Sequence, residues 1–254
     1  MSDAFSVHNA RIVDQFTRWA KPFAALPVHA EADSMKLTLD ACCVSKDMKV
    51  LDVACGPGIV ACELARAGAE VTGIDLTPAM IDQARQRADS MGVGVQYQVG
   101  DALHLPYDAA CFDRVVTRYS FHHMPDPGKA LAEMVRVCRK GGRVIVIDAT
   151  PAPECQKAYD RAEILRDPSH TSALTLSQLL ALGVEEGLSL DATHQYRLES
   201  RLQDLVNPED WPALRSLFAE DIASGQDHLG MGAWAAEDGV HFYFPISIVV
   251  WIKK

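Results

Sequence analysis

The pattern of hydrophobic and polar positions changes its period along this chain, and each change predicts an element. Apolar residues recur at helical spacing over residues 7–25, which predicts an amphipathic first helix, and a second helix is expected over residues 32–41. Over residues 49–150, short apolar runs typical of buried strands alternate with helical stretches, the last of which is expected over residues 126–142. Strand–helix alternation of this kind predicts a parallel sheet with helices on both faces.

This alternation stops in the second half of the chain. Residues 151–187 are expected to be largely helical, residues 188–200 to form a strand, and residues 200–225 to return to helix. The apolar run over residues 240–254 predicts a last strand. No internal repeat and no low-complexity linker divides the chain, so a single domain over residues 1–254 with helical additions is predicted.

The charge, the apolar runs and the cysteines of the chain indicate which cellular compartment and which binding partners to expect. A formal net charge of -10 disfavours phosphate backbones and anionic membranes, so no nucleic-acid partner is expected. No run reaches the roughly 18 apolar residues of a transmembrane helix, so no membrane span is predicted. The seven cysteines include no C-x-x-C pair, which favours reduced core thiols, a cytoplasmic protein and no metal site.

A glycine-rich stretch follows the first expected strand and opens a helix. The sequence "VLDVACGPGIVA" fits the G-x-G-x-x-G/A pattern through Gly56, Gly58 and Ala61. Glycine lets the backbone approach a ligand closely there. Asp75 ends the second strand 19 residues after Gly56, where a carboxylate accepts hydrogen bonds from ribose hydroxyls. The pattern therefore predicts a nucleoside-containing cofactor, either NAD or S-adenosylmethionine.

Two further carboxylates and the end of the chain favour S-adenosylmethionine. Asp52 lies four positions before the first glycine and suits a cationic group, such as the ammonium of a methionine moiety. Asp101 follows the third strand, where its carboxylate could accept a hydrogen bond from an adenine amino group. The last strand follows a long segment, as a strand added on the open edge of the sheet would.

The ordered set of motifs resembles the class I S-adenosylmethionine-dependent methyltransferases. It is most similar to the branch that contains the ubiquinone and menaquinone-biosynthesis C-methyltransferases and related small-molecule enzymes. The stretches that carry the resemblance fall within residues 48–150 and are "VLDVACGPG", "VTGIDLTPAMIDQAR", "GDALHLPYDAACFDRVV" and "FHHMPDPGKALAEMVRVCRKGGRVIVID". The resemblance implies a Rossmann-like α/β fold with sheet order 3-2-1-4-5-7-6 and an antiparallel last strand.

The change in strand–helix rhythm predicts how the chain is divided, and the resemblance implies which residues meet the cofactor. The expected divisions are an N-terminal helical lid over residues 1–45, a cofactor-binding core over 46–150, a helical cap over 151–187, and strands and a helix over 188–254 that complete the sheet. The residues implied to contact S-adenosylmethionine, whose product is S-adenosylhomocysteine, are Asp52, Ala54, Cys55, Gly56, Gly58, Asp75, Leu76, Asp101, Ala102 and Arg118.

Each of the three carboxylates also has a plainer interpretation. Asp52 could end its strand in solvent, Asp75 could cap the following helix, and Asp101 could cap a short helix at Ala102. Because the three carboxylates occur within an ordered set of motifs, we do not expect all three to be plain structural residues.

Two adjacent histidines follow the fourth strand, on the carboxyl side where open α/β sheets bind ligands. A general base assists transfer to a hydroxyl or phenolic acceptor, and histidine titrates near neutral pH. His122 and His123 are therefore candidate bases, and His170 in "EILRDPSH" is a third. Alternatively, one of the adjacent pair packs internally while the other bonds the loop, and His170 lies in a helix terminus capped by Asp167.

Four other side chains are candidates for the acceptor pocket. Arg166 could bind a carboxylate or a quinone oxygen. Phe16 and Trp19 on the first helix could close over the cofactor, although a plain core stripe has the same spacing. Tyr243, near the end of the chain, is the fourth candidate.

The sequence as a whole predicts an enzyme that transfers a methyl group from S-adenosylmethionine to a small organic acceptor, such as a quinone, a phenol or a natural product. C-, O- and N-methylation share this scaffold, so the acceptor atom and the oligomeric state stay open. Two alternatives remain: an S-adenosylmethionine-binding protein of the same fold with other chemistry or regulation, and an NAD-dependent oxidoreductase.

Overall fold

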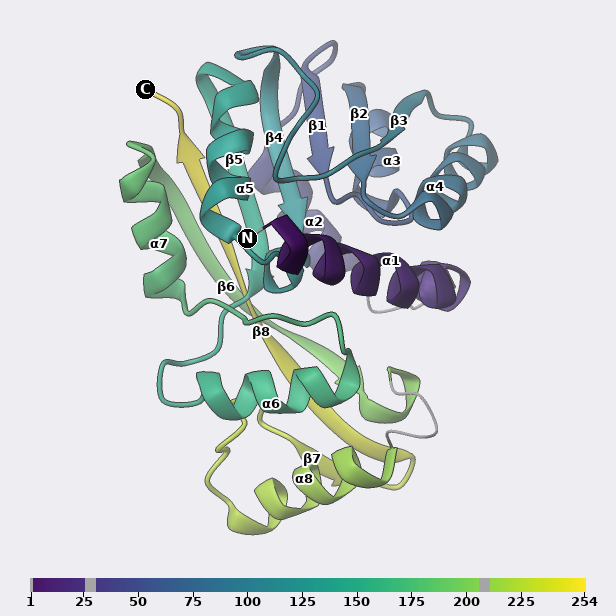
Figure 1. Cartoon of the computed structure of the whole chain (residues 1–254), viewed down its shortest axis with the longest axis vertical. Coiled ribbons are helices and arrows are strands. Elements are labelled where there is room, and N and C mark those ends of the chain that lie inside the picture. The colour runs from purple at the N-terminus through teal and green to yellow at the C-terminus, as the bar shows by residue number, and fades with distance from the viewer. Residues whose placement is uncertain (1, 26–30, 206–210) are drawn as a thin grey trace.

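One mixed sheet runs through the middle of the molecule in the computed structural model, which describes residues 2–25, 31–205 and 211–254 (Figure 1). The strands are β1 Lys49–Val53, β2 Glu70–Asp75, β3 Val95–Val99, β4 Phe112–Arg118, β5 Cys138–Ala149, β6 Ser189–Arg201, β7 Trp234–Ala236 and β8 Gly239–Ile252. The helices are α1 Ser2–Ala25, α2 Ala32–Cys42, α3 Ile59–Arg66, α4 Pro78–Met91, α5 Pro127–Val137, α6 Gln156–Arg166, α7 Leu176–Glu185 and α8 Trp211–Ser224. Two short 3-10 turns are η2 Phe121–His123 and η3 Leu202–Asp204.

The strand order is β3-β2-β1-β4-β5-β8-β6, and the short strand β7 pairs with β8 outside that path. Strands β1 to β5 pair in parallel, whereas β8 is antiparallel to both β5 and β6. With β8 counted as the seventh strand of the predicted order, this arrangement confirms the order 3-2-1-4-5-7-6 and the antiparallel last strand. Strand β7 was not predicted.

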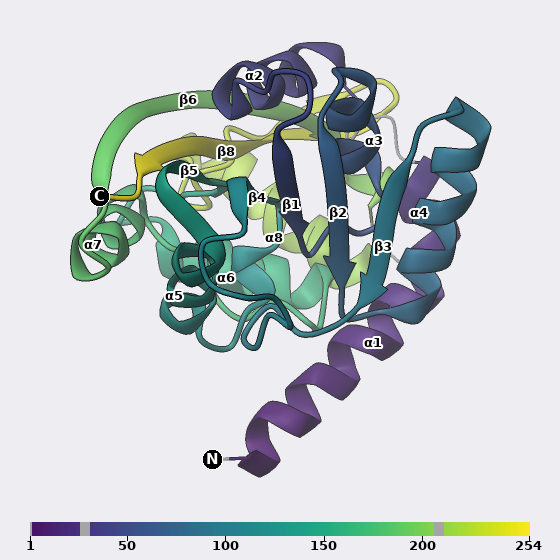
Figure 2. The same ribbon diagram turned by 90° about the horizontal axis from the view of Figure 1, so that it is seen from above.

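Helices cover both faces of the sheet (Figures 1 and 2). Alternate residues of a strand point to opposite faces, so Val50 of β1 packs in a core with α2, α3, α6 and α8, while Leu51 packs in a core with α5 and α7. Helix α1 lies across the carboxyl ends of the first strands and contacts α4 (Figure 2). Among the helices that the structure describes, none has the length and apolar character needed to cross a membrane.

Strands β6 and β8 extend beyond the rest of the sheet. Strand β8 pairs with β5 from Ile252 to Ile246, but it continues beside β6 as far as His241. Helices α6 and α8 and strand β7 surround this extension (Figure 1). Helix α6 packs on this extension, and the segment after α6, residues 167–175, lies at the carboxyl edge of the sheet. There the N–H of Thr171 donates to the carbonyl of His122 in the turn after β4.

Two boundaries differ from the prediction because pairing with distant strands sets them. The helix expected over residues 126–142 ends at Val137, and β5 begins at Cys138, which pairs with Phe112 of β4. The next pair joins Arg114 to Arg143, so the charged and glycine-rich residues between form a bulge in β5.

The second boundary lies at the end of β6. Instead of the helix expected from residue 200, the strand continues to Arg201, which pairs with His241 of β8, and helix resumes at Trp211. The helical segment expected over residues 151–187 consists of α6 and α7, and the residues between these two helices have no regular structure.

Candidate active site

A cavity lies at the carboxyl ends of β1, β2, β3 and β4, between the loops that follow these strands and α1. Nine of the ten residues predicted to contact a cofactor line it, and Gly58 is the exception. The lining also includes Asn9, Ile12, Phe16, Tyr119, Ser120 and His123.

Asp52 is the most deeply buried carboxylate of this cavity. Only 2% of its surface is exposed, and its Oδ2 has no hydrogen-bond partner in the described part of the chain. Burial raises the pKa of Asp52 to about 8, and the charge of Asp75 adds to the shift, while the backbone N–H of Ala61 opposes it. A buried carboxyl oxygen without a hydrogen-bond partner is costly, and a ligand's cation beside it would add to the charge of Arg118 in favouring the ionised form. The position therefore suits a ligand's ammonium group.

The glycine turn after β1 presents backbone to the cavity. Ala54 and Gly56 have φ angles of 54° and 51°, and a Cβ on Gly56 would meet no atom within 4 Å. Gly58 has another function, since a Cβ there would lie 2.4 Å from the hydroxyl of Tyr97 and 2.9 Å from Cβ of Ala84. Gly58 thus allows α3 to pack closely against α4 and β3, and it lies outside the cavity wall.

Asp75 ends β2 and accepts hydrogen bonds from two backbone groups. Its Oδ2 accepts from the N–H of Gly56 and its Oδ1 from the N–H of Thr77, both at 2.8 Å. Burial raises the pKa of Asp75, and these two hydrogen bonds oppose the rise. Each carboxylate oxygen can accept more than one hydrogen bond, so Asp75 can hold the glycine turn and the start of α4 while it still binds a ligand.

Asp101, after β3, is shared in a similar way. Its Oδ1 accepts a hydrogen bond from the N–H of Leu103 at 2.9 Å. This is the local bond expected if Asp101 caps the turn at Ala102. Its Oδ2 accepts from Nδ2 of Asn9 at 3.3 Å, and this bond joins α1 to the rim of the cavity. Leu76 and Ala102 follow the two carboxylates in sequence and add apolar surface to the wall.

Arg118 ends β4 and brings a positive charge to the cavity wall with only 9% of its surface exposed. Its Nη2 donates to Oγ of Ser34 at 2.9 Å and to the hydroxyl of Tyr119 at 3.0 Å. The Tyr119 hydroxyl also meets that of Tyr196 on β6 at 2.7 Å. Tyr119 has a φ of 58°, which is uncommon for a bulky residue. These contacts connect α2, the end of β4 and β6 around the cavity.

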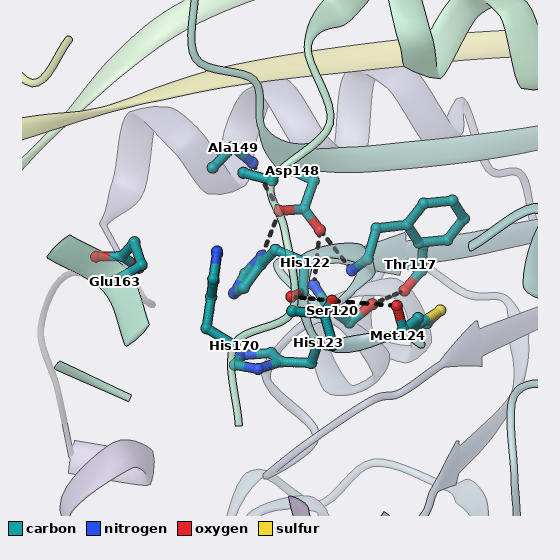
Figure 3. Close-up of polar contacts among 12 residues, drawn as sticks. Thr117, Ser120, His122, His123, Met124, Asp148, Ala149, Glu163 and His170 are labelled. Carbon is teal, nitrogen blue, oxygen red and sulfur yellow. Dashed lines mark hydrogen bonds and ion pairs between the residues drawn. The ribbon is translucent and has the colours of Figure 1, made fainter. Parts of the chain in front are cut away.

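His122 is held by Asp148, which lies one residue before the end of β5 (Figure 3). Its Nδ1 lies 2.5 Å from Oδ1 of Asp148, whose Oδ2 accepts from the N–H groups of Ser120 at 2.9 Å and Phe121 at 2.6 Å. Burial alone would lower the pKa of His122, but the charge and hydrogen bond of Asp148 raise it above the usual value. Because Nδ1 faces the carboxylate, Nε2 is the nitrogen left to accept a proton.

His123 lines the cavity, whereas His122 and His170 do not. Its Nδ1 lies 3.1 Å from Oγ of Ser169, and that hydroxyl donates to Oδ1 of Asp167 at 2.6 Å. Burial and the charge of His122 lower the pKa of His123, which keeps its ring neutral. A lowered pKa weakens a base at neutral pH, so His122 has the proton affinity better suited to that role.

His170 comes from the segment between α6 and α7 and lies near the adjacent pair (Figure 3). Its ring centre is 5.5 Å from that of His122, and its Nε2 lies 2.8 Å from Oδ1 of Asp160. The backbone N–H and the hydroxyl of Thr171 both donate to the carbonyl of His122 at 2.8 Å. The structure therefore brings the three predicted histidines together and fixes the cap segment on the turn after β4.

Arg166 and Tyr243 do not line the cavity. The guanidinium of Arg166 donates from Nε and Nη2 to the two oxygens of Glu163 at 3.0 and 2.6 Å, and it lies 5.7 Å from the ring of Phe244. This pairing compensates its charge, which reduces its attraction for a carboxylate on an acceptor. Tyr243 lines a separate cleft, where Arg197 lies 5.6 Å from its ring.

Helix α1 contributes Phe16, whose ring meets that of His123 edge-on at 5.0 Å. Nε2 of His8 lies 2.8 Å from the carbonyl oxygen of His123. Helix α1 therefore contacts the turn η2, called the histidine turn below, as well as Asp101. The side chain of Trp19 lies outside the residues described, and its predicted place at the site stays a prediction.

Comparison with known proteins gives a family. A family model described as a methyltransferase domain matches residues 51–146. The uncharacterized methyltransferase YcgJ of Bacillus subtilis is 29% identical over 203 residues, which are 79% of this chain and 80% of that protein. The crystal structure of YcgJ matches with a TM-score of 0.80 at 23% identity, over 87% of this chain and 98% of that one. Residues 51–146 of this chain form a methyltransferase domain, and the fold is that of the class I methyltransferases.

Two relatives of this methyltransferase match over a shorter stretch. The demethylmenaquinone methyltransferase of Deinococcus radiodurans is 41% identical over 105 residues, which are 41% of this chain and 44% of that protein. The demethylmenaquinone methyltransferase of Thermus thermophilus is 39% identical over 108 residues, which are 42% of this chain and 49% of that protein. The aligned stretch is less than half of each relative, so these likenesses concern the shared domain.

Asn9, Ile12 and Asp148 are among the residues of the methyltransferase site that were not anticipated from the sequence. Asn9 and Ile12 line the cavity with Phe16, and positions 9, 12 and 16 fall on one face of a helix, so helical spacing could have identified them. Asp148 lies near the end of a parallel strand, as Asp75 does, and the same reasoning about strand ends would have indicated it.

Proposed function

We propose that this methyltransferase binds S-adenosylmethionine in the cavity and methylates a small organic acceptor with an acidic hydroxyl, such as a phenol, an enol or a quinol. The observation that supports it most strongly is the convergence of Asp52, Asp75 and Asp101 on one cavity at the ends of three adjacent parallel strands. Three carboxylates in this order match the ammonium, ribose and adenine groups of one extended ligand. The likeness to two demethylmenaquinone methyltransferases supports the choice of acceptor class.

Groups of the chain suit each part of this ligand. The unpartnered oxygen of Asp52 suits the ammonium, and the open backbone at Gly56 suits the methionine moiety. Asp75 retains acceptor capacity for the ribose hydroxyls, and Asp101 for the adenine amino group. When bound, the cofactor supplies a methyl group that its sulfonium has already activated.

The chain's own residues orient the acceptor and take its proton. Ser120 and His123 line the cavity, and His122 lies between them in the same turn but outside the lining, so this proposal requires the bound acceptor to reach His122 from the cavity. Nε2 of His122 accepts the hydroxyl proton, and Asp148 holds the ring and stabilises the resulting imidazolium. Loss of that proton makes the acceptor oxygen, or a ring carbon conjugated with it, nucleophilic toward the methyl group. Alignment of the reacting atoms and exclusion of water supply the rest of the acceleration.

Turnover with methyl-labelled S-adenosylmethionine tests this function. The enzyme is incubated with phenols and quinols and with their amine and thiol counterparts, and mass spectrometry identifies labelled products. We expect label on phenol or quinol members, and we expect His122→Ala to reduce the rate of labelling about 10²–10⁴-fold. His194→Ala, a change of an exposed histidine on β6, is the matched control and should leave turnover intact. Labelling of amines or thiols alone would contradict the acceptor class, and cofactor binding with no labelled product would favour the binding-only alternative.

A further inference from the structure

Helix α1 presents one polar side chain to the adenine end of the cavity. Asn9 lines the cavity on the same helical face as Ile12 and Phe16, and its Nδ2 donates to Oδ2 of Asp101 at 3.3 Å. Asn9 is partly buried there, on a helix that lies across the carboxyl ends of the strands (Figure 2). Of the three α1 residues that line the cavity, Asn9 is polar and Ile12 and Phe16 are apolar, and the polar one lies beside Asp101.

The partner of Asn9 fixes the orientation of its amide. A carboxylate only accepts hydrogen bonds, so the amide nitrogen must face Asp101 and the amide oxygen must point elsewhere. The other oxygen of Asp101 is bonded to the N–H of Leu103. An amino group that enters this end of the cavity therefore has two acceptors available, Oδ2 of Asp101 and Oδ1 of Asn9.

We propose that Asn9 is a specificity-determining residue that recognises the 6-amino group of the cofactor's purine together with Asp101. This inference rests on the proposed function, because it takes the cavity to hold S-adenosylmethionine with its adenine near Asp101. A 6-amino purine offers two N–H donors to these two acceptors. A 6-oxo purine offers an acceptor at the same place, and it would oppose both oxygens.

Recognition by Asn9 also connects the two ends of the cavity through α1. The same helix carries Phe16, which packs on His123 at 5.0 Å, and His8, which meets the carbonyl of His123. A purine that satisfies Asn9 therefore favours the position of α1 in which His8 and Phe16 also contact His123. Through α1, binding of the purine at Asn9 is thus coupled to the contacts that cover the cavity beside His123.

Calorimetric titration with two ligands tests the inference. S-adenosylhomocysteine and its deaminated form, S-inosylhomocysteine, are titrated into the wild type, into Asn9→Leu, and into the control Thr17→Leu on an exposed position of the same helix. Loss of one hydrogen bond should lower the affinity of Asn9→Leu for S-adenosylhomocysteine about 5- to 10-fold. Binding of S-inosylhomocysteine should change less than about twofold, so the preference for the amino purine falls by nearly the same factor. Thr17→Leu should keep the wild-type preference.

The outcomes separate this inference from the proposed function. If Asn9→Leu weakens both ligands by the same factor, or neither, Asn9 only positions α1 and the inference is wrong. If the wild type binds neither ligand, the proposed function itself fails. Asn9→Ala, which removes the amide without adding apolar bulk, should show the same loss of preference, and thermal melting by circular dichroism verifies that each variant is folded.

Discussion

Replacement of Asp52 by asparagine should remove most of the pH dependence of cofactor binding. In the ligand-free protein, burial raises the pKa of Asp52 to about 8, so this carboxyl is mostly protonated at neutral pH. An ammonium group bound beside it favours the ionised form, so binding is coupled to the release of a proton. Affinity should therefore rise with pH until Asp52 is ionised without ligand.

The size of this effect follows from the pKa. With a pKa of about 8, the ionised fraction of Asp52 is roughly 1% at pH 6 and roughly a quarter at pH 7.5. If only the ionised form binds, the affinity for S-adenosylhomocysteine should rise about 20-fold over this interval. Asp52→Asn carries no titrating charge, so its affinity should change less than about twofold over the same interval and should lie below that of the wild type at pH 7.5.

Calorimetry at several pH values measures this dependence directly. The matched ligand is 5′-methylthioadenosine, which keeps the adenosine but lacks the ammonium, and its affinity should not rise with pH. Titrations in buffers with different ionisation enthalpies should also show that S-adenosylhomocysteine binding releases close to one proton at pH 6.5. The reasoning is refuted if both ligands show the same pH dependence, or if Asp52→Asn keeps the slope of the wild type.

Four further predictions concern Asp75, His122, Asp148 and Gly58. Asp75→Ala should make the binding free energy of S-adenosylhomocysteine less favourable by about 1.5–3 kcal/mol, the scale of hydrogen bonds to a charged group. Unchanged affinity in calorimetry would exclude the assignment of Asp75 to the ribose. His122→Ala should reduce turnover by about 10²–10⁴-fold with cofactor binding intact, and a reduction below about threefold would argue against base catalysis. Because a base must be unprotonated, wild-type turnover should rise with pH through a value above 6.5, and Asp148→Asn should move that rise to lower pH in the pH–rate profile. Gly58→Ala should lower the free energy of unfolding by about 1–3 kcal/mol in urea titrations, because its Cβ would collide with Tyr97; wild-type stability would contradict that packing.

The parallel half of the fold could be predicted because its signals are local. Each buried strand is a short apolar run, and each following helix has its own period and stop signal, as at Gly92 after α4. The end of α5 could not be predicted in this way, because pairing of Cys138 with Phe112 on another strand extends β5 into residues that look helical. The length of β6 likewise depends on its distant partner β8, where Arg201 pairs with His241.

The site shows the same division between local and long-range information. The carboxylates could be located because parallel strands end at one edge of the sheet, which brings Asp52, Asp75 and Asp101 to one cavity. The sequence presented capping and ligand binding as alternatives, whereas the structure shows that Asp75 bonds the N–H of Thr77 and also lines the cavity. Contacts between distant segments, such as that of His8 with the histidine turn, had no local signal.

Within the cap, one contact could be predicted from the sequence and another could not. The pairing of Arg166 with Glu163 follows from i,i+3 spacing on one helix and could have been anticipated. The approach of His170 to His122 depends on how the segment between α6 and α7 folds back onto the turn after β4. No pattern in the sequence of that segment indicates this path, because tertiary contacts determine it.

A crystal structure of the complex with S-adenosylhomocysteine would test the central claim most directly. The account predicts electron density for the ligand in the cavity at the ends of β1, β2 and β3, with its ammonium beside Asp52, both ribose hydroxyls on Asp75 and its adenine amino group beside Asp101. Density for the ligand in another cleft, or in this cavity with the adenine at Asp52 and the amino acid end at Asp101, would contradict it.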